Sequence, residues 1–246
     1  MAYNFNAPRE AAACIDWIKD WFERESGAAD GIIIGMSGGA DSTVTAKLCC
    51  EAVGSTRVLG VLMPDGEQHD IADAVRACEL SGIKYKIINI KDISSKFAEI
   101  YDFSEQARIN IPPRIRLSVL YALGQSINYR AAGTGNLSER YVGYFTKWGI
   151  GEACDFNPVA DFTKSELIKI GEYLGLASEL VHKIPADGLS GKSDEENMGI
   201  SYAVLDKYIR TGDWDEQDEQ IISRIIKLHA AAQHKIKPVP FYAAGG

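Results

Sequence analysis

One short apolar run, ended by a turn of serine and glycine, most constrains what this chain can fold into. Residues 31–35 read Gly-Ile-Ile-Ile-Gly, and a continuous run of β-branched residues is typical of a strand buried on both faces of a parallel sheet. Ser37-Gly38-Gly39 interrupts the run, and a helix is predicted over residues 41–53. Strand, glycine-rich turn and helix in this order predict one crossover unit of an α/β protein.

The same alternation continues along the chain. Further strands are predicted at residues 58–63, 85–90 and 131–134. Helices are predicted at 8–25, 70–80, 92–101, from just after Pro112-Pro113 to about residue 130, and at 163–174, 200–210 and 215–233. The pattern predicts a doubly wound parallel sheet in a single domain over residues 1–246, with helices at its C-terminal end. Residues 143–161, rich in glycine, asparagine, aspartate and aromatic residues, are predicted to form a functional loop.

The turn after the first strand has the composition of an anion site. Glycines let the backbone approach a ligand closely, and the helix that follows directs unpaired N–H groups and its positive dipole end at the turn. Asp41 would repel phosphate by itself, so a Mg²⁺ ion is predicted beside it. The alternative, a glycine-rich turn without a ligand, leaves the serines and the acid unexplained. The predicted ATP-phosphate residues are Gly35, Met36, Ser37, Gly38, Gly39, Ala40, Asp41 and Ser42.

Several segments resemble those of one enzyme family. The sequence SGGADS at residues 37–42 resembles the SGGxDS loop of the ATP pyrophosphatase superfamily, whose members cleave ATP between its α- and β-phosphates. Within that superfamily, further segments resemble the NAD synthetases in family order. They are residues 110–117, 133–139 (GTGNLSE), 143–149 (GYFTKWG), 155–158, 193–202 and the pair His234-Lys235.

The resemblance implies both a fold and a reaction. The fold is that of the adenine nucleotide alpha hydrolases. The reaction is the ATP-dependent amidation of deamido-NAD by ammonia, which gives NAD, AMP and pyrophosphate through an acyl-adenylate. No protein nucleophile is needed, so the protein's task is positioning and charge neutralisation.

The resemblance also implies roles for single residues. Asp41 and Glu139 would bind Mg²⁺, and Thr134, Lys164 and Ala186 would contact ATP. Deamido-NAD would be contacted by Arg114, Lys147, Asp155, His234 and Lys235. Because ammonia is mostly ammonium at neutral pH, Asp155 is also the expected proton acceptor.

The chain departs from the family pattern in three places, one of which is Leu62, where some relatives have an arginine before the proline. Ala186 stands where many relatives have a threonine, so only its backbone would contact ATP. The loop between Lys147 and Asp155 is one residue longer than in many relatives.

Composition narrows the choice of partners and compartment. The chain has 26 basic and 34 acidic residues and a net charge of −8, without the basic face expected of a protein that follows a nucleic-acid backbone. No apolar stretch approaches the ~18 residues of a membrane helix, and no secretion signal is evident. Five scattered cysteines are typical of reduced thiols. We therefore expect a cytoplasmic protein that binds neither nucleic acid nor membrane.

Two other functions stay open on the sequence. One is a related ATP-pyrophosphatase-type enzyme acting on tRNA, which would be expected to carry a basic surface and often cysteine pairs. The other is a non-catalytic nucleotide-binding module, which would be expected to lack Asp41 or Glu139.

The resemblance makes two further predictions. It implies a homodimer with the dinucleotide site at the subunit interface, which an aromatic helix around Trp17, Trp21 and Phe22 would help to bury. Relatives that use glutamine carry a separate amidohydrolase domain, and 246 residues leave no room for one beside the synthetase domain. Free ammonia, or ammonia from a partner, is therefore the expected donor.

Overall fold

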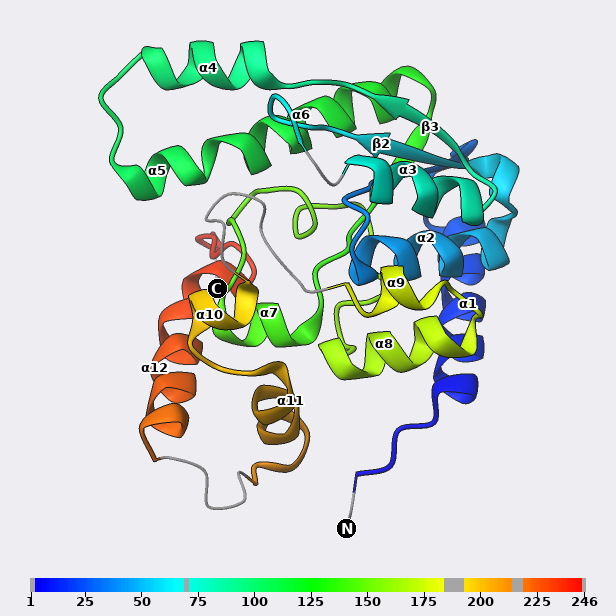
Figure 1. Ribbon diagram of the computed structural model, residues 1–246. Helices are drawn as coiled ribbons and strands as arrows, with labels where there is room; N and C mark the ends of the chain where they lie inside the picture. Colours follow the sequence, from blue (N-terminus) through cyan, green and yellow to red (C-terminus); the bar gives the residue numbers. More distant parts are fainter. Residues whose placement is uncertain (1–2, 69–70, 184–192, 214–218, 245–246) are drawn as a thin grey trace.

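Four parallel strands form the centre of the molecule. The computed structural model describes residues 3–68, 71–183, 193–213 and 219–244. The strands lie in the order β3-β2-β1-β4 (Figure 1). They are β1 (Gly31–Gly35), β2 (Val58–Leu62), β3 (Lys84–Ile87) and β4 (Tyr129–Ala132). The predicted α/β class with a doubly wound parallel sheet is confirmed.

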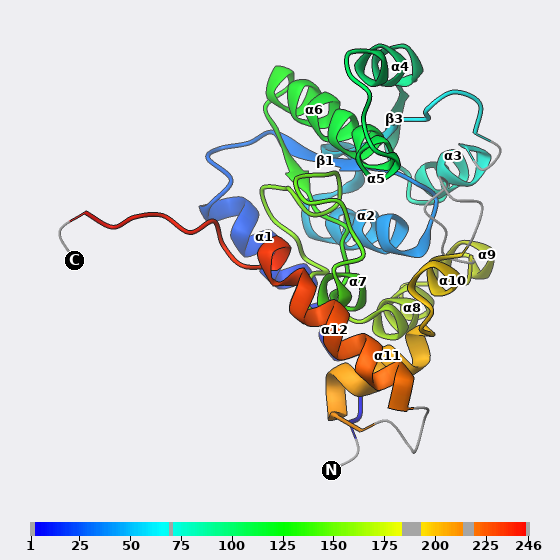
Figure 2. The ribbon, with the colours of Figure 1, turned by 90° about the vertical axis from the view of Figure 1, so that its left-hand side faces the viewer.

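Helices cover both faces of this sheet (Figures 1 and 2). In β1, Ile32 and Ile34 belong to the core shared with one helical layer, and Ile33 belongs to the core shared with the other. The first layer contains α1 (Ala7–Arg24), α2 (Ala40–Val53), α3 (Ile71–Leu80), α8 (Lys164–Tyr173) and α9 (Ser178–Val181). The second contains α4 (Lys91–Glu99), α5 (Glu105–Ile109) and α6 (Ile111–Ser126). Because all three isoleucines are fully buried, the β-branched run behaves as predicted for a central parallel strand.

A third apolar cluster joins the C-terminal helices beside the sheet. It is built around Val142, Met198, Leu205 and Ile225, all of them buried. The helices are α7 (Leu137–Val142), α10 (Asp194–Met198), α11 (Tyr202–Thr211) and α12 (Glu219–Ile236). In Figure 1 they lie below the sheet's carboxyl edge, so they bring late parts of the sequence toward the loops after β1 and β4.

The boundaries around β4 differ from the prediction. The long helix α6 ends at Ser126 instead of continuing to about residue 130, and β4 occupies residues 129–132 instead of 131–134. Asn128 has a φ of +55°, which turns the chain from helix to strand. Gly124 lies so close to the carbonyl of Tyr129 that an added Cβ would be 3.1 Å from its oxygen. This tight turn between α6 and β4 sets the boundary, and the periodicity of hydrophobic residues in the sequence does not reveal it.

Other elements are shorter than predicted or were missed. β3 ends at Ile87 instead of residue 90, and all four of its side chains are exposed because it is an edge strand. The short helices α5, α7, α9 and α10 lie in segments for which no helix was predicted. The predicted starts of the helices at 70 and 215 lie outside the described residues, as does Ala186.

The aromatic residues of α1 face in different directions. Phe22 is buried in the core, and Trp21 stacks on Phe156 with ring centroids 4.2 Å apart. Only Trp17, which is 46% exposed, faces outward. Phe22 therefore packs inside this chain, and the prediction that this helix helps to bury a subunit interface stays a prediction. Among the described helices, none is both long and apolar enough to cross a bilayer.

Candidate active site

The site lies where the sheet changes direction of winding. After β1 the chain continues to β2 on one side, whereas β4 pairs with β1 on the other side. In parallel α/β sheets, the loops leaving two such strands diverge and leave a crevice at their carboxyl ends, where ligands bind. The glycine-rich turn follows β1 here, and residues 133–136 follow β4.

The turn after β1 is held by its own serines. The hydroxyls of Ser37 and Ser42 lie 3.1 Å apart, the N–H of Ser37 donates to Ser42 Oγ, and Ser42 Oγ donates to the carbonyl of Gly39. Gly38 has a φ of +77°, and an added Cβ would lie 2.5 Å from the backbone nitrogen of Ala74. Only glycine fits both demands. The sequence therefore folds the turn tightly against α3 and leaves the N-terminus of α2 facing the crevice.

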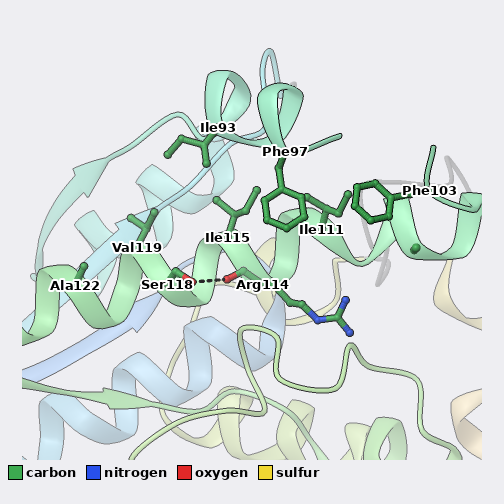
Figure 3. Close-up of a pocket in the computed structure, with 10 residues that line it drawn as sticks. Ile93, Phe97, Phe103, Ile111, Arg114, Ile115, Ser118, Val119 and Ala122 are labelled. Atoms are coloured by element: carbon green, nitrogen blue, oxygen red, sulfur yellow. Dashed lines mark hydrogen bonds between the residues drawn. The ribbon is translucent and has the colours of Figure 1, made fainter. Parts of the chain in front are cut away.

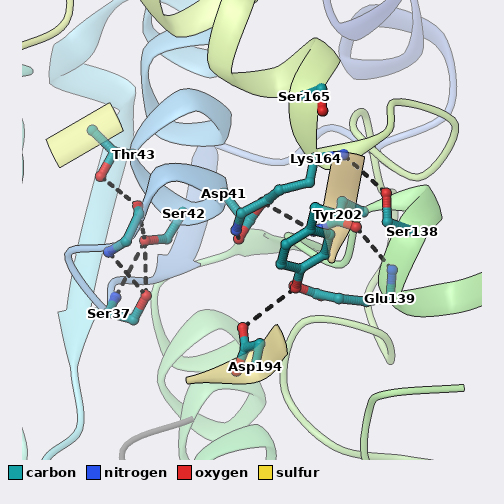
Figure 4. Close-up of polar contacts among 12 residues, drawn as sticks. Ser37, Asp41, Ser42, Thr43, Ser138, Glu139, Lys164, Ser165, Asp194 and Tyr202 are labelled. Atoms are coloured by element: carbon teal, nitrogen blue, oxygen red, sulfur yellow. Dashed lines mark hydrogen bonds and ion pairs between the residues drawn. The ribbon is translucent and has the colours of Figure 1, made fainter. Parts of the chain in front are cut away.

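Asp41 stands in the first turn of α2 beside a buried lysine (Figure 4). Its Oδ2 accepts from Lys164 Nζ at 2.5 Å, and its Oδ1 accepts from the side-chain amide of Asn136 at 3.1 Å. The Lys164 side chain is 4% exposed. Figure 4 shows the side chains of Glu139 and Tyr202 gathered at the same place. Residues from four separate segments therefore form one polar cluster, called here the Lys164 cluster: Asp41, Asn136, Glu139, Lys164 and Tyr202.

Carboxyl groups outnumber cationic groups in this cluster. Burial, and next the charge of Asp41, raise the pKa of Glu139 well above its usual value. Burial lowers the pKa of Lys164, but Asp41 and Glu139 outweigh that effect, and the pKa lies above its usual value. Lys164 therefore stays charged, and its one ammonium group faces the carboxyl groups of Asp41, Glu139 and Asp194. A cluster of this kind favours an additional cation.

A second group of predicted residues surrounds the loop at 143–149. Lys147 Nζ donates to the carbonyl of His234 at 2.6 Å, and Arg114 Nε donates to the carbonyl of Lys147 at 3.3 Å. Lys235 Nζ donates to the carbonyls of Gly143 and Phe145 at 2.7 and 2.8 Å. Burial, together with the nearby charge of Arg114, lowers the pKa of Lys235. These contacts collect three cationic side chains from α6, the loop and the end of α12.

Comparison with known proteins identifies the family. The family model described as NAD synthase matches residues 10–239. The chain belongs to the NAD synthase family. It is therefore an ATP-using ligase of NAD biosynthesis, and the resemblance drawn from the motifs is confirmed.

Individual relatives agree with the family match. The chain is 39% identical over 221 residues to the NH(3)-dependent NAD(+) synthetase of Archaeoglobus fulgidus, covering 87% of this chain and 89% of that protein. It is 40% identical over 205 residues to the protein of the same name in Thermococcus kodakarensis, covering 82% and 80%.

Two solved structures share its fold. The NMN synthetase from Francisella tularensis superposes with a TM-score of 0.88 at 31% identity, over 97% of this chain and 99% of that one. The NH3-dependent NAD synthetase from Campylobacter jejuni, in complex with the nitrate ion, superposes with a TM-score of 0.81 at 26% identity, over 98% and 100%.

Two residues predicted for this NAD synthase site stand apart from both groups. Thr134 lies two residues after the end of β4, and its N–H donates to the carbonyl of Gly151 at 3.0 Å. Asp155 lies beside β4 and is exposed; its carboxylate accepts from the N–H of Ala131 at 2.7 Å and from the Tyr121 hydroxyl at 3.3 Å. No described contact joins Asp155 to the Lys164 cluster.

Sequence reasoning missed three residues of the site. Asn136 is fully buried, caps α7 by accepting from the N–H of Glu139, and donates to Asp41. An asparagine three residues before a glutamate is a helix-start signal that would have revealed the cap. Tyr202 donates to Asp194 Oδ2 at 3.4 Å, and its ring lies 5.5 Å from Lys164 Nζ. Their matched segments gave no hint of a role, since only the fold brings them to Lys164.

Proposed function

We propose that this chain makes NAD from deamido-NAD, ATP and ammonia. In this reaction the nicotinate carboxylate attacks the α-phosphorus of ATP and pyrophosphate leaves. Ammonia then attacks the resulting acyl-adenylate and AMP leaves. Family membership and the ammonia-dependent relatives support the proposal. The observation that carries it is the Lys164 cluster beside a glycine-rich turn at the N-terminus of α2.

The turn and the cluster divide the work of binding ATP. Free N–H groups at the start of α2 face the crevice and suit the phosphates, whose binding Gly38 and Gly39 permit at short range. Lys164 supplies a fixed positive charge, because the pKa of its ammonium group lies above the usual value. As pyrophosphate leaves, negative charge accumulates near this ammonium group, and a preorganised charge there stabilises the transition state.

The carboxylates suit Mg²⁺ bound together with ATP. Mg²⁺ in nucleotide sites is usually held by one or two carboxylates together with substrate phosphates and water. Asp41 and Glu139 supply two carboxyl groups beside one lysine, and burial, followed by the charge of Asp41, raises the pKa of Glu139. Among the described residues no group of three or more metal-ligating side chains occurs, so phosphate oxygens would complete the coordination. When bound, the ion would neutralise phosphate charge.

The cationic group around the 143–149 loop is proposed to hold deamido-NAD. Arg114, Lys147 and Lys235 bring positive charge to a substrate that carries a diphosphate and a carboxylate. His234 and Asp155 are proposed as further contacts. Lys147 and Lys235 donate to backbone carbonyls in this structure, so they are already fixed in position before substrate binds.

Isotope transfer tests the reaction directly. Purified protein is incubated with ATP, Mg²⁺, ammonium and deamido-NAD carrying ¹⁸O in the nicotinate carboxylate. We expect NAD, AMP and pyrophosphate in equal amounts, with one ¹⁸O atom transferred to AMP because the carboxylate oxygen leaves with it. ADP and phosphate as products, or AMP without label, would refute the acyl-adenylate. Glutamine in place of ammonium is expected to give no NAD in ammonia-free preparations.

One comparison supports testing a second substrate. The NMN synthetase from Francisella tularensis superposes with a higher TM-score than the Campylobacter jejuni NAD synthetase, 0.88 against 0.81. An enzyme of the same chemistry that makes NMN would amidate nicotinate mononucleotide instead of the dinucleotide. Measuring kcat/KM for both substrates under the same conditions decides between them; we expect the dinucleotide to be preferred.

A homodimer is the proposed assembly, through the layer of α4, α5 and α6. A cavity of about 480 Å³ opens between these helices, lined almost entirely by apolar side chains (Figure 3). Ile93 and Phe97 beside it are 50% and 45% exposed, and Arg114 of the proposed substrate site lies on the same wall. A second copy covering this face would bury the apolar side chains next to the substrate site.

Light scattering tests the dimer. Ile93→Asp with Phe97→Asp is expected to give a monomer, because each places a charge at the apolar contact. Ile226→Asp on α12, a position 53% exposed and away from this face, is the matched control and should stay dimeric. A wild-type mass of one chain, with full activity, would refute the assembly.

A further inference from the structure

Residues 149–155 fold back onto the loops that leave β1 and β4. The N–H groups of Thr134 and Gly135 both donate to the carbonyl of Gly151, at 3.0 and 3.1 Å. Ile150 lies so close to Gly35 that an added Cβ on this glycine would be 2.4 Å from Ile150 Cδ1. The segment therefore borders the start of the phosphate turn and the residues after β4, at the mouth of the crevice.

Glu152, within this segment, carries a carboxylate oxygen without a donor. The side chain is 11% exposed, and its Oε2 lies 3.3 Å from Arg140 Nη1. Its Oε1 is shielded from solvent and accepts no hydrogen bond from any described residue. This oxygen lies over Gly135, where an added Cβ would approach it to 2.3 Å. A buried acceptor without a donor is destabilising, and a bound N–H donor would remove that cost.

Asp155 differs from Glu152 in each of these respects. It is exposed, and both of its carboxylate oxygens already accept hydrogen bonds, from the N–H of Ala131 and from the Tyr121 hydroxyl. Those contacts fasten the loop to β4 and α6. A carboxylate engaged in this way is a weaker choice for receiving a proton from a ligand than one with a free oxygen.

We infer that Glu152, and not Asp155, is the carboxylate that accepts the proton of ammonium at the amidation step, an inference that rests on the function proposed above. Ammonium transfers one proton to Glu152 Oε1 and becomes neutral ammonia. The nitrogen lone pair attacks the carboxyl carbon of the acyl-adenylate, the C–O bond to AMP breaks, and AMP leaves with the electron pair. The nitrogen then loses a second proton to solvent, which leaves the neutral amide.

The charged surroundings of Glu152 suit this role. Arg140, on α7, and Cys154, in the same loop, are the groups that face it electrostatically. Burial raises the pKa of the Glu152 carboxyl above its usual value, and Arg140 lowers it by less. A raised pKa makes a carboxylate a better proton acceptor. Burial raises the pKa of Cys154 to about 12, so this thiol is neutral at physiological pH.

The experiment separates adenylation from amidation in Glu152→Gln, and Asp155→Asn is measured beside it to test the competing proton acceptor. Adenylation is followed by exchange of labelled pyrophosphate into ATP, with deamido-NAD present and no nitrogen donor. Amidation is followed with ammonium and, separately, with hydroxylamine, which is neutral at the assay pH. We expect Glu152→Gln to keep exchange within about twofold and to lower kcat/KM for ammonium about 10²-fold, the usual contribution of a general base. With hydroxylamine the loss should be only a few fold.

A second variant separates catalysis from structure. Because Arg140 lowers the pKa of Glu152, Arg140→Gln should move the acid limb of the kcat/KM profile for ammonium to higher pH; a merely structural contact would not move it. This shift decides the matter if Glu152→Gln fails to fold. Equal loss of exchange and amidation in Glu152→Gln, near-normal use of ammonium, or the selective defect in Asp155→Asn would overturn the inference. A wild-type protein inactive in both assays would instead refute the proposed function.

Discussion

Two buried ionic clusters begin from the same turn of α8 and differ in how their charges are matched. Lys164 and Glu166 are two residues apart and point to different sides of the helix. Lys164 faces Asp41 and Glu139, whereas Glu166 faces Arg210 on α11. In the second cluster the carboxylate accepts two bonds from Arg210, at 2.8 and 2.6 Å, one from the N–H of Thr163 at 2.8 Å and one from the Tyr3 hydroxyl.

The pKa values record this difference. Burial raises the pKa of Glu166, but the hydrogen bonds from Arg210 and Tyr3 outweigh it, and the pKa lies below its usual value. Burial and Asp41 raise the pKa of Glu139 instead. One cluster is matched charge for charge and completed by hydrogen bonds, which is typical of a structural pair. The other holds more carboxyl groups than cations and a carboxyl of strongly raised pKa, which is typical of a functional site.

The largest expected effect is on catalysis at the unmatched cluster. Asp41→Asn keeps the size of the side chain and removes its charge. Loss of one preorganised electrostatic contribution lowers the rate about 10²–10³-fold, so we expect at least that loss in kcat for NAD formation. The fold should persist, because Glu139 remains to balance Lys164.

Glu139→Gln should behave in the same way. The double variant should be little worse in rate than either single one, since both residues are proposed to act through one metal ion. The measurement is steady-state NAD formation over a Mg²⁺ titration, which should partly restore each single variant, with circular dichroism as the control for folding. Near-normal turnover in Asp41→Asn would refute the metal role.

The sequence was sufficient to predict the charged residues of the Lys164 cluster. The residue types of the glycine-rich turn predict Asp41, the resemblance to the NAD synthetases implies Glu139 and Lys164, and the structure brings all three together. Asn136 was recoverable from its helix-start signal. Their mutual distances were not, because each residue comes from a different loop or helix, and only the packing of the sheet sets those distances.

The ion pair between Glu166 and Arg210 was not predictable from the sequence. Glu166 and Arg210 lie on separate helices 44 residues apart, in segments where any surface acid or base would fit the helical pattern. The alternation of strands and helices was read correctly, because buried β-branched runs leave a strong local signal. The end of α6 was misplaced, because Asn128 and Gly124 act through backbone geometry that hydrophobic periodicity does not contain.

The matched cluster predicts a large effect on stability instead of catalysis. Arg210→Met removes the cation that compensates the buried Glu166 carboxylate, whose side chain is 4% exposed. Breaking such a pair from one side costs about 3–5 kcal/mol; because the Arg210 side chain is 21% exposed, we expect about 3 kcal/mol. Urea unfolding measures the loss. Activity per folded molecule should stay within twofold. A loss of turnover as large as that expected for Asp41→Asn, without destabilisation, would reverse the comparison.

The contributions of Glu166 and Glu139 to folding stability should also change with pH in opposite directions. A carboxyl group whose folded pKa is depressed contributes stability above its unfolded pKa, about 4.3, and loses it as the pH falls through the folded value. Glu166→Gln should therefore cost about 2 kcal/mol at neutral pH and progressively less in acid. A group whose folded pKa is raised contributes stability that is full below the unfolded pKa and lost as pH rises through the folded value. The free energy of unfolding of Glu139→Gln should therefore rise relative to that of wild type, by on the order of 1 kcal/mol, as the pH rises above about 4.3.

Urea unfolding from pH 4 to pH 9 measures both differences. The two curves of variant minus wild type should diverge with rising pH, Glu139→Gln upward and Glu166→Gln downward. Curves that run parallel would show that the clusters are electrostatically alike.

The test with the smallest expected effect removes one tyrosine hydroxyl from each cluster. Tyr3 donates to Glu166 with Arg210 5.5 Å from its ring centroid, and Tyr202 donates to Asp194 with Lys164 5.5 Å from its ring centroid. Phenylalanine at either position keeps the ring beside the cation and removes only the hydroxyl.

A hydrogen bond to a charged group in the half-exposed setting of Tyr3 contributes about 1 kcal/mol, so Tyr3→Phe should lower the unfolding free energy by that amount and leave kcat/KM unchanged. Tyr202→Phe should leave stability nearly unchanged and lower kcat/KM about fivefold, the equivalent of one such hydrogen bond, because Tyr202 helps to place Asp194 beside Lys164. Both variants are measured by urea unfolding and by steady-state NAD formation. Equal losses of activity in the two variants would show that the cluster of Glu166 reaches the reaction after all, and the separation between a structural and a catalytic side of α8 would fail.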